Sequence, residues 1–169
     1  MPTGAAHVSV VRVGPDQWRV YRDVRIASLI DSPRAFWSTY AEASDRTQEQ
    51  WRGRLGPDFP TWVALEDGRP LGTVALWHAP HQARAEGLLV GMWVASVARG
   101  TGVADALVQG ALEQARVLGW RRVLLDVAHE NHRAATFYRR LGFSPTGEVG
   151  EMPWDPSVTE ETLALDLHT

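Results

Sequence analysis

The sequence predicts an α/β (α+β) fold in which helices cover both faces of one mixed sheet. Two observations lead to this prediction. Strands joined by a hairpin signal come early in the chain, and a strand–helix–strand crossover follows them, so the sheet needs both antiparallel and parallel neighbours. The chain has 169 residues, which is an ordinary length for one domain and short for two, and it contains no recognisable linker. We therefore expect residues 1–169 to form a single domain.

The individual elements follow from apolar spacing and turn residues. The spacing predicts strands at residues 7–13, 61–66, 70–77, 87–94, 121–127, 143–149 and 162–167. It predicts helices at 15–29, 102–118 and 134–141, with one or two short helices within 38–55. Asp67-Gly68 is a strong hairpin signal between the second and third strands. Gly119 ends the helix at 102–118, whose apolar residues recur with a clean i, i+4 spacing.

Composition narrows the possible function classes. The net charge is −3 and the isoelectric point is about 6.1, so no basic field favours nucleic acid as a partner. The chain has no cysteine, which excludes disulfides, thiolate nucleophiles and cysteine zinc sites. No apolar stretch approaches the roughly 20 residues that cross a bilayer, and no signal peptide is visible. We expect a cytoplasmic protein with no membrane or nucleic-acid partner.

A glycine-containing turn before the helix at 102–118 is the first functional signal. A buried strand ends near Val94, and Gly100 and Gly102 stand where the helix begins. The first N–H groups of a helix lack internal partners and carry partial positive charge, so this position favours an anion. Glycines allow a phosphate to approach the backbone closely, and Arg99 can add a charge-assisted hydrogen bond. By itself the turn could be a plain loop, and it matches neither glycine motif typical of ATP or NAD sites.

A second motif follows the next strand, and the two motifs together are more specific than the turn alone. Residues 126–143 read DVAHENHRAATFYRRLGF, in which Asn131 precedes a helix that carries Phe137 and Tyr138. The R-x-x-G-x-A turn at 99–104 and the N…FY…GF pattern at 131–143 together closely resemble the GCN5-related N-acetyltransferase (GNAT) superfamily. The resemblance extends in element order over residues 61–167 and is sharpest over 90–143.

This resemblance implies a more specific fold and a co-substrate. The expected sheet is mixed and mostly antiparallel, with six to seven strands, about four helices on its two faces, and a splayed fourth and fifth strand. Acetyl-CoA (coenzyme A) is the implied co-substrate, without a metal. Its pantetheine arm would pair with a strand end, and its pyrophosphate would bind main-chain N–H groups of the turn. The residues implied in coenzyme A binding are Met92, Trp93, Val94, Arg99, Gly100, Thr101, Gly102, Val103, Ala104, Asp105 and Asn131.

The resemblance also implies the catalytic groups. Tyr138 would stand near the thioester sulfur and protonate the leaving thiolate, which suits a phenol of ordinary pKa near 10 and a thiol near 8.5. Asp126 holds the position of a carboxylate that acts as base in similar N-terminal acetyltransferases. An aspartate reaches less far than the usual glutamate, so a water relay is favoured for it. Glu86, Glu130 and water itself are the alternatives, and Asp126 could instead pair with a neighbouring arginine.

The sequence says less about the acceptor of the acetyl group than about its donor, acetyl-CoA. We expect a primary amine, either a small molecule or a protein amine, and a homodimer is compatible with the family. Two histidine pairs, His78/His81 and His129/His132, lack the context of a zinc site. The aromatic residues of segment 31–40, and Trp154, could face the acceptor or only pack. The alternative function is a non-catalytic acyl-CoA-binding or sensing domain, which the presence of Tyr138 disfavours.

Overall fold

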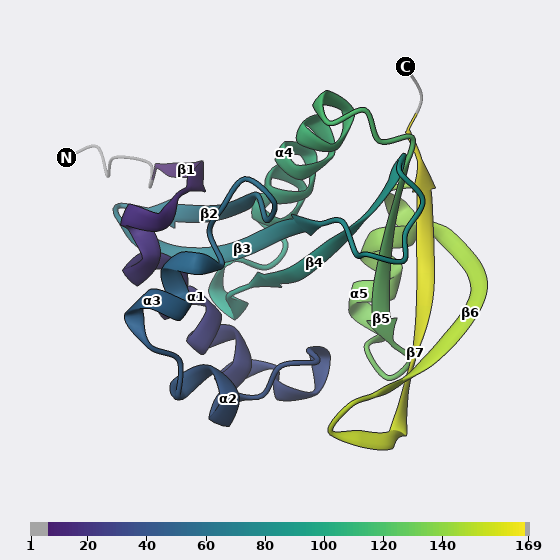
Figure 1. The fold of residues 1–169 in the computed structure, drawn as a ribbon, viewed down its shortest axis with the longest axis horizontal. Helices are drawn as coiled ribbons and strands as arrows, with labels where there is room; N and C mark the ends of the chain where they lie inside the picture. The colour runs from purple at the N-terminus through teal and green to yellow at the C-terminus, as the bar shows by residue number, and fades with distance from the viewer. Residues whose placement is uncertain (1–6, 168–169) are drawn as a thin grey trace.

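Seven strands form one sheet in the computed structural model, which describes residues 7–167. In chain order the elements are β1 (Val8–Val13), α1 (Trp18–Asp31), α2 (Tyr40–Ser44), α3 (Gln48–Gly53), β2 (Thr61–Glu66), β3 (Arg69–Trp77), β4 (Glu86–Val94), α4 (Val103–Val117), β5 (Arg122–Ala128), α5 (His132–Arg140), β6 (Ser144–Met152) and β7 (Asp155–Asp166). The order in the sheet is β1-β2-β3-β4-β5-β7-β6 (Figure 1). Only β4 and β5 run parallel, and the other neighbours are antiparallel. The predicted mixed, mostly antiparallel sheet is therefore confirmed.

The last two strands are longer than the sequence predicts. Expected at 143–149 and 162–167, they extend to Met152 and begin at Asp155, so that a short turn joins them. Prolines and glycines in this stretch made it resemble a loop, but β6 is an edge strand, where such residues are tolerated. Its pairing with β7 is interrupted between Pro145 and Val149. The longer β7 matters for function because it brings Glu160 into the sheet.

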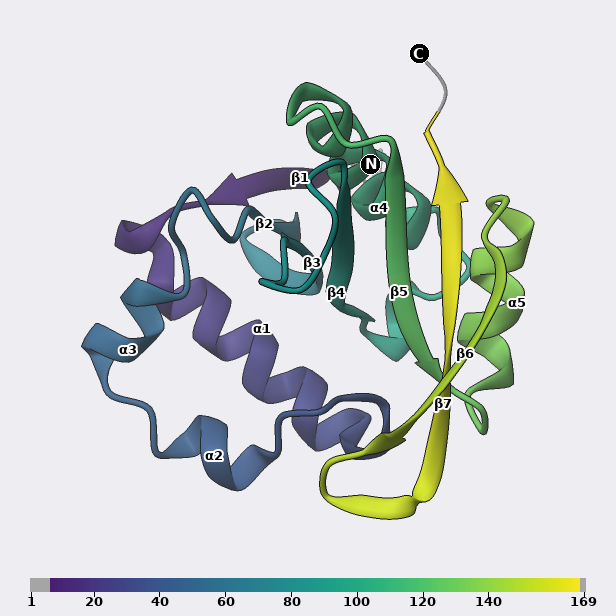
Figure 2. The ribbon, with the colours of Figure 1, turned by 45° about the vertical axis from the view of Figure 1, so that its right-hand side comes forward.

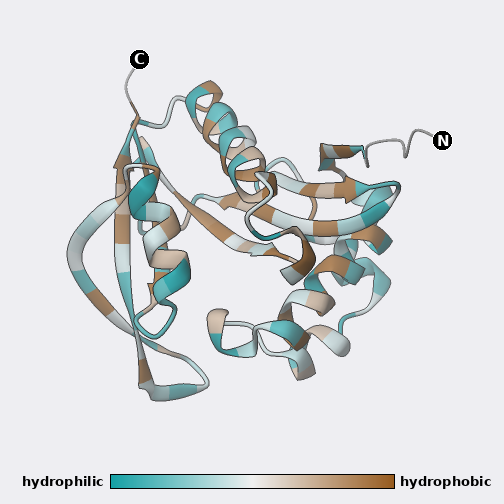
Figure 3. Ribbon diagram, turned by 180° about the vertical axis from the view of Figure 1, so that it is seen from behind, coloured by the Kyte–Doolittle hydropathy of each residue, from teal (hydrophilic) through white to brown (hydrophobic). Residues whose placement is uncertain are grey.

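The two faces of the sheet bury separate cores. Helices α4 and α5 cover one face and lie in front of the sheet when the molecule is seen from behind (Figure 3). Helices α1, α2 and α3 lie on the other side (Figure 2) and pack in a second cluster with Val63 and Trp93. In α4 the buried residues are those with the i, i+4 spacing, from Val103 to Ala115. No helix within residues 7–167 is long and apolar enough to cross a bilayer.

Strands β4 and β5 pair at only one end, which gives the splay that the resemblance implies. Their ladder joins Glu86–Leu88 to Arg122–Leu124 and stops there, although β4 continues to Val94 and β5 to Ala128. At the paired end a side chain on Gly87 would collide with the indole of Trp120, so the indole occupies the space above this glycine. Beyond Leu88, the edge of β4 that faces β5 has no ladder partner. The fold thus leaves a strand edge open in the middle of a sheet.

Candidate active site

A cavity of about 370 Å³ lies where β4 and β5 separate. Residues 88–92 of β4 and 125–128 of β5 line its two sides. Tyr21 and Arg25 reach it from α1, and Ala134 and Tyr138 reach it from α5, which packs with the opposite core. The cavity is therefore reached by side chains from both faces of the sheet. A volume of this size is typical of sites for small ligands.

The turn before α4 has the geometry of an anion site. Gly100 and Gly102 have positive φ values of 78° and 92°, a conformation that other residues rarely adopt. Gly102 is the N-cap residue of α4 and has no side chain to cap the helix. The first helical hydrogen bond runs from the N–H of Ala106 to the carbonyl of Gly102. The N–H groups at positions 103–105 therefore precede the first helical hydrogen bond and are available to a ligand. The start of α4 can therefore bind an anion through the N–H groups at 103–105.

Arg99 is engaged differently from the sequence expectation of a contact with phosphate. Its Nε donates to the carbonyl of Val94 at 3.0 Å, and its Nη2 donates to Asp31 at 2.8 Å. The indole of Trp93 donates to the same oxygen of Asp31 at 3.0 Å. The hydrogen bond from Trp93, together with those from Ser32 and Arg99, holds the pKa of Asp31 below its usual value. In this structure the Arg99 side chain connects the turn to the end of α1.

The other residues that the resemblance implies in coenzyme A binding lie at different places in the structure. Met92 lines the cavity, whereas the side chains of Trp93 and Val94 are buried in the two separate cores. The side chain of Asp105 pairs with Arg140 of α5 at 3.2 Å. Asn131 lines the cavity and caps α5, because its Oδ1 accepts from the N–H of Ala134 at 3.3 Å. That bond uses the carbonyl side of the amide and leaves its two N–H donors for a ligand.

Tyr138 stands in the cavity wall on the α5 side. It is 7% exposed, and its ring makes edge contacts with Phe137 and Phe143, at centroid distances of 5.2 and 5.7 Å. Burial raises the pKa of the Tyr138 hydroxyl above its usual value near 10, so the phenol keeps its proton at every physiological pH. Within residues 7–167 the hydroxyl has no hydrogen-bond partner. A protonated hydroxyl in a cavity wall is suited to give a proton to a leaving group.

The predicted base candidates are separated by the structure. Asp126 lines the cavity, and its Oδ1 accepts from the hydroxyl of Thr162 at 2.6 Å. Within residues 7–167, Asp126 forms no ion pair with Arg121 or Arg122, the alternative partners, and Arg122 lies instead 3.5 Å from Glu86 and 3.7 Å from Asp166. Glu86 is thus held at the paired end of β4 and β5, away from the cavity lining. Glu130 is held by Arg34 at 2.7 Å, beside the cavity.

Glu160 is a carboxylate of the cavity that sequence reasoning missed. It is 5% exposed, and both of its oxygens accept from the indole of Trp37 at 3.0 Å. Desolvation, reinforced by the nearby charge of Asp126, raises the pKa of Glu160. Glu160 pairs with Ala128 and Asp126 pairs with Thr162, so the two carboxylates are diagonal neighbours on one face of the sheet. The available signal was the β-favouring pair Val158 and Thr159, which lies just before the strand predicted from 162.

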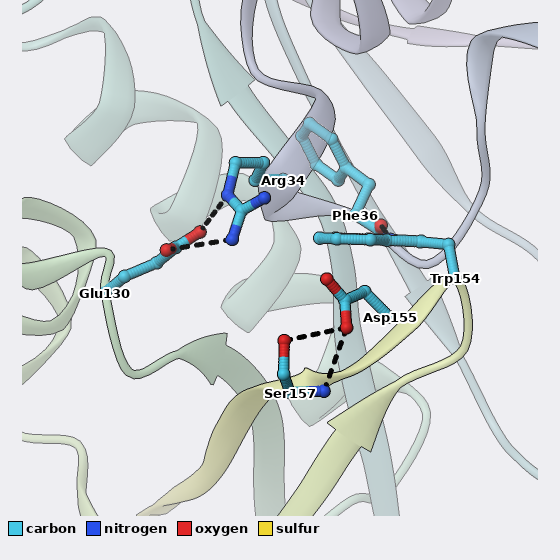
Figure 4. Close-up of polar contacts among 6 residues, drawn as sticks. All are labelled: Arg34, Phe36, Glu130, Trp154, Asp155 and Ser157. Atoms are coloured by element: carbon cyan, nitrogen blue, oxygen red, sulfur yellow. Dashed lines mark hydrogen bonds and ion pairs between the residues drawn. The ribbon is translucent and has the colours of Figure 1, made fainter.

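The tip of the β6–β7 hairpin is fastened to the segment that follows α1. Trp154 donates from its indole to the carbonyl of Phe36 at 2.7 Å, and the guanidinium of Arg34 lies over the Trp154 ring at 5.4 Å (Figure 4). Arg34 also bonds both oxygens of Glu130 (Figure 4). Phe36 and Trp37 line the cavity, while Trp154 does not. Trp154 therefore supports the cavity wall from outside.

The histidine pairs make ordinary polar contacts. His78 lies 3.1 Å from the carbonyl of Ala83, and His129 lies 2.7 Å from the hydroxyl of Thr159. Among residues 7–167, no group of three or more acidic or histidine side chains could hold a metal ion.

Comparison with known proteins places this geometry in a family. The family model described as "Acetyltransferase (GNAT) family" matches residues 25–143, which is more than half of the chain. The chain belongs to this family. The matched region includes the turn at 99–105, both strands of the open edge and the helix that carries Tyr138. It ends before β6 and β7, which supply Glu160.

Individual relatives agree with this assignment. Human N-acetyltransferase 8B is 30% identical over 140 residues, a match that covers 79% of this chain and 58% of the human protein. A GCN5-related N-acetyltransferase from Kribbella flavida is 25% identical and superposes with a TM-score of 0.74 over 95% of this chain and 98% of the other. The structure of yncA from Salmonella typhimurium with its cofactor acetyl-CoA has a TM-score of 0.76 at 15% identity, over 97% of this chain and 96% of the other. The last likeness concerns the fold alone.

Proposed function

We propose that this protein is an acetyl-CoA-dependent N-acetyltransferase that moves an acetyl group to a primary amine. One observation carries the proposal. The cavity between the separated strands is lined at once by the open edge of β4, by Tyr138 and by two carboxylates, Asp126 and Glu160. A donor-binding edge, a proton donor and proton acceptors therefore share one small space. Family membership supports the same transfer chemistry.

The donor half of the site fits coenzyme A. The edge of β4 beyond Leu88 has free main-chain groups that can pair with the amides of a pantetheine arm, as an added strand does. The N–H groups at 103–105 can hold the pyrophosphate, and the side-chain amide of Asn131 can bond the arm. The chain's own contribution is to bind and orient the thioester with its carbonyl in the cavity and away from water. Bound acetyl-CoA supplies the activated acetyl group.

Transfer then needs two proton movements. The neutral amine attacks the thioester carbonyl carbon, a C–N bond forms, and the C–S bond breaks. Tyr138 gives its proton to the departing sulfur, and the nitrogen loses one proton to a base. Burial raises the pKa of the Tyr138 hydroxyl, so the phenol is protonated and its proton is available when the C–S bond breaks.

Glu160 is the better placed of the two cavity carboxylates to act as base. Its raised pKa brings the carboxylate closer to the pKa of an amine, which makes proton transfer more favourable. Trp37 fixes its orientation through both oxygens. Asp126 is bonded by Thr162 and can relay a proton through water. The ion pairs of Glu86 and Glu130 disfavour those two residues.

Release of free thiol from acetyl-CoA tests the proposal. Purified protein is incubated with acetyl-CoA and a panel of primary amines, and thiol release is followed with mass detection of the acetylated product. We expect amine-dependent release with one acetyl group added per thiol. Measurable binding of acetyl-CoA without release for any amine would support the alternative, a domain that senses acyl-CoA. The match covers 58% of the human relative. The same assay on the full-length relative would show whether its additional segments change which amine is acetylated.

A further inference from the structure

Three arginines gather at the end of the cavity formed by α1 and α3. Arg25 lies in α1, Arg46 lies between α2 and α3, and Arg54 follows α3. Arg25 and Arg54 line the cavity, and Arg46 stands behind them near enough to influence both charges. Among residues 7–167, Arg25 and Arg54 are the only arginines or lysines of the cavity lining. The feature is a local positive region in a protein whose net charge is −3.

Of the three arginines only Arg25 is buried, while Arg46 and Arg54 are half-buried, with their guanidinium groups over the rings of Trp51 and Phe59. Arg25 is 8% exposed and rests on the ring of Phe36 at 4.6 Å. Within residues 7–167, Arg25 Nη1, Arg46 Nη1 and Arg54 Nε are buried without a hydrogen-bond partner. None of the three forms an ion pair with a carboxylate of the described residues. Buried charges are almost always paired, so the unpaired Arg25 beside a cavity, with two further cations near it, points to a ligand that supplies the anion.

Arg25 remains a cation under working conditions. Burial, together with the charges of Arg54 and Arg46, lowers the pKa of Arg25 to about 10, which still leaves it protonated at neutral pH. Its location is also specific. A Cβ added to Gly91 would lie 3.8 Å from Arg25 Nη1, so the guanidinium stands beside the open part of β4. A charge there is close to the site of acetyl transfer.

The opposite side of the cavity carries the negative groups. Arg25 stands beside Gly91 of β4, whereas Asp126 and Glu160 lie on β5 and β7, across the gap between the separated strands. The cavity is therefore polarised, with guanidinium groups at one end and carboxylates at the other. A ligand that carries both an amine and an anion matches this arrangement, with the amine toward Glu160 and the anion toward Arg25.

We propose that the acceptor is a small primary amine that also carries a carboxylate, and that Arg25, assisted by Arg54, binds this carboxylate. The proposal rests on the N-acetyltransferase function proposed above and names its substrate class. Guanidinium groups bind carboxylates through directed, often paired hydrogen bonds, which satisfy the orphaned donors. A cavity of about 370 Å³ also has to hold the acetyl end of the donor, which favours a small acceptor of the amino-acid type.

A second role for Arg25 makes a different prediction. A cation beside β4 could stabilise the oxyanion that forms on the thioester carbonyl during transfer, whatever the acceptor. In that case loss of Arg25 slows transfer to every amine equally. If Arg25 binds the acceptor carboxylate, its loss affects only amines that carry one. Comparison of matched acceptors separates the two roles.

The experiment measures kcat/KM for free amino acids and for the corresponding amino-acid amides. The amine of an amide is less basic, so at neutral pH a larger fraction of it is in the neutral, nucleophilic form. A preference for the acids therefore cannot come from the availability of neutral amine. We expect the wild type to prefer acids at least about tenfold, and Arg25→Met to lower kcat/KM for acids by about 10–100-fold while changing the amides by less than about threefold. Arg22→Met is the matched control, because Arg22 lies on the same helix and pairs with Asp23. It should leave kcat/KM unchanged for both the acids and the amides.

Equal losses for acids and amides, or a wild-type preference for amides, would overturn the proposal. Calorimetry keeps the test independent of turnover. Amino acids are titrated into the protein saturated with coenzyme A, using the wild type and Arg25→Met. Binding that disappears in Arg25→Met supports the carboxylate site even if no amine is acetylated, in which case the proposed function fails alone. Absence of amino-acid binding to the wild type overturns the carboxylate site whether or not other amines are acetylated.

Discussion

Asp31 and Arg99 form an ion pair of 2.8 Å that joins the end of α1 to the turn before α4. Trp93 at the end of β4 donates to the same carboxylate oxygen. One carboxylate thus links the end of α1, the end of β4 and the glycine-containing turn before α4. The position of Asp31 at a helix C-terminus is unfavourable toward the helix dipole, and these donors offset it.

Replacing Asp31 by asparagine tests this connection. Asp31→Asn should lower the free energy of unfolding by about 1 kcal/mol at pH 7, a modest value because the carboxylate is 39% exposed and screened. The folded-state pKa is depressed, so the contribution of the charge is present above the usual value of 3.8 and is lost as the pH falls through the folded-state value. Urea denaturation at pH 7 and pH 3 measures it, and the difference between variant and wild type should shrink at pH 3. Asp23→Asn, on the exposed face of α1, is the control and should be nearly neutral.

Gly87 controls the end at which β4 and β5 are joined. Gly87→Ala places a methyl group against the Trp120 indole and should destabilise the protein by about 2 kcal/mol, as overpacking does. Gly53→Ala is the control, because no atom lies within 4 Å of the added methyl group. Thermal denaturation of both variants measures the difference.

The mechanism behind the Gly87 effect has its own test. If contact with the indole is the cause, a smaller ring in Trp120→Phe should relieve part of the cost, so that the double variant loses less than the sum of the two single variants. Strict additivity would show that the glycine acts in another way.

The sequence predicts the glycine-containing turn before α4 better than it predicts the side chains that line the cavity, for a physical reason. The turn with Gly100 and Gly102 is specified by local backbone needs, and those needs are visible in consecutive residues. Arg25 and Glu160 lie 135 positions apart and meet one cavity only because the sheet order places β5 and β7 together and α1 beneath β4. Glu160 was also missed because Pro153 and Pro156 made the start of β7 resemble a loop.

Glu160→Gln distinguishes the two cavity carboxylates. We expect kcat to fall about 100-fold at pH 7 if Glu160 is the base, and Asp126→Asn, the matched control, to have a much smaller effect. Burial raises the pKa of Glu160 above its ordinary 4.5, and the base must be ionised, so wild-type kcat should decline as the pH falls through this raised value and the Gln variant should lose that decline. A larger effect from Asp126→Asn would assign the base to Asp126.

The raised pKa of Glu160 also affects the stability of the protein. Ionisation of Glu160, which the proposed reaction needs, lowers stability. A raised folded-state pKa means that the ionised carboxylate is disfavoured by folding, so the wild type should lose stability relative to Glu160→Gln as the pH rises above 4.5. Denaturation at several pH values gives this trend independently of activity.

The most direct test of the account compares turnover and binding in Tyr138→Phe. The ring and its contacts with Phe137 and Phe143 are kept, and only the hydroxyl is removed. Steady-state thiol release should show kcat reduced about 100-fold, while calorimetry should show the acetyl-CoA Kd changed by less than about twofold. Unchanged kcat, or equal losses of turnover and acetyl-CoA affinity, would contradict a proton-donating role for Tyr138 in the cavity between β4 and β5.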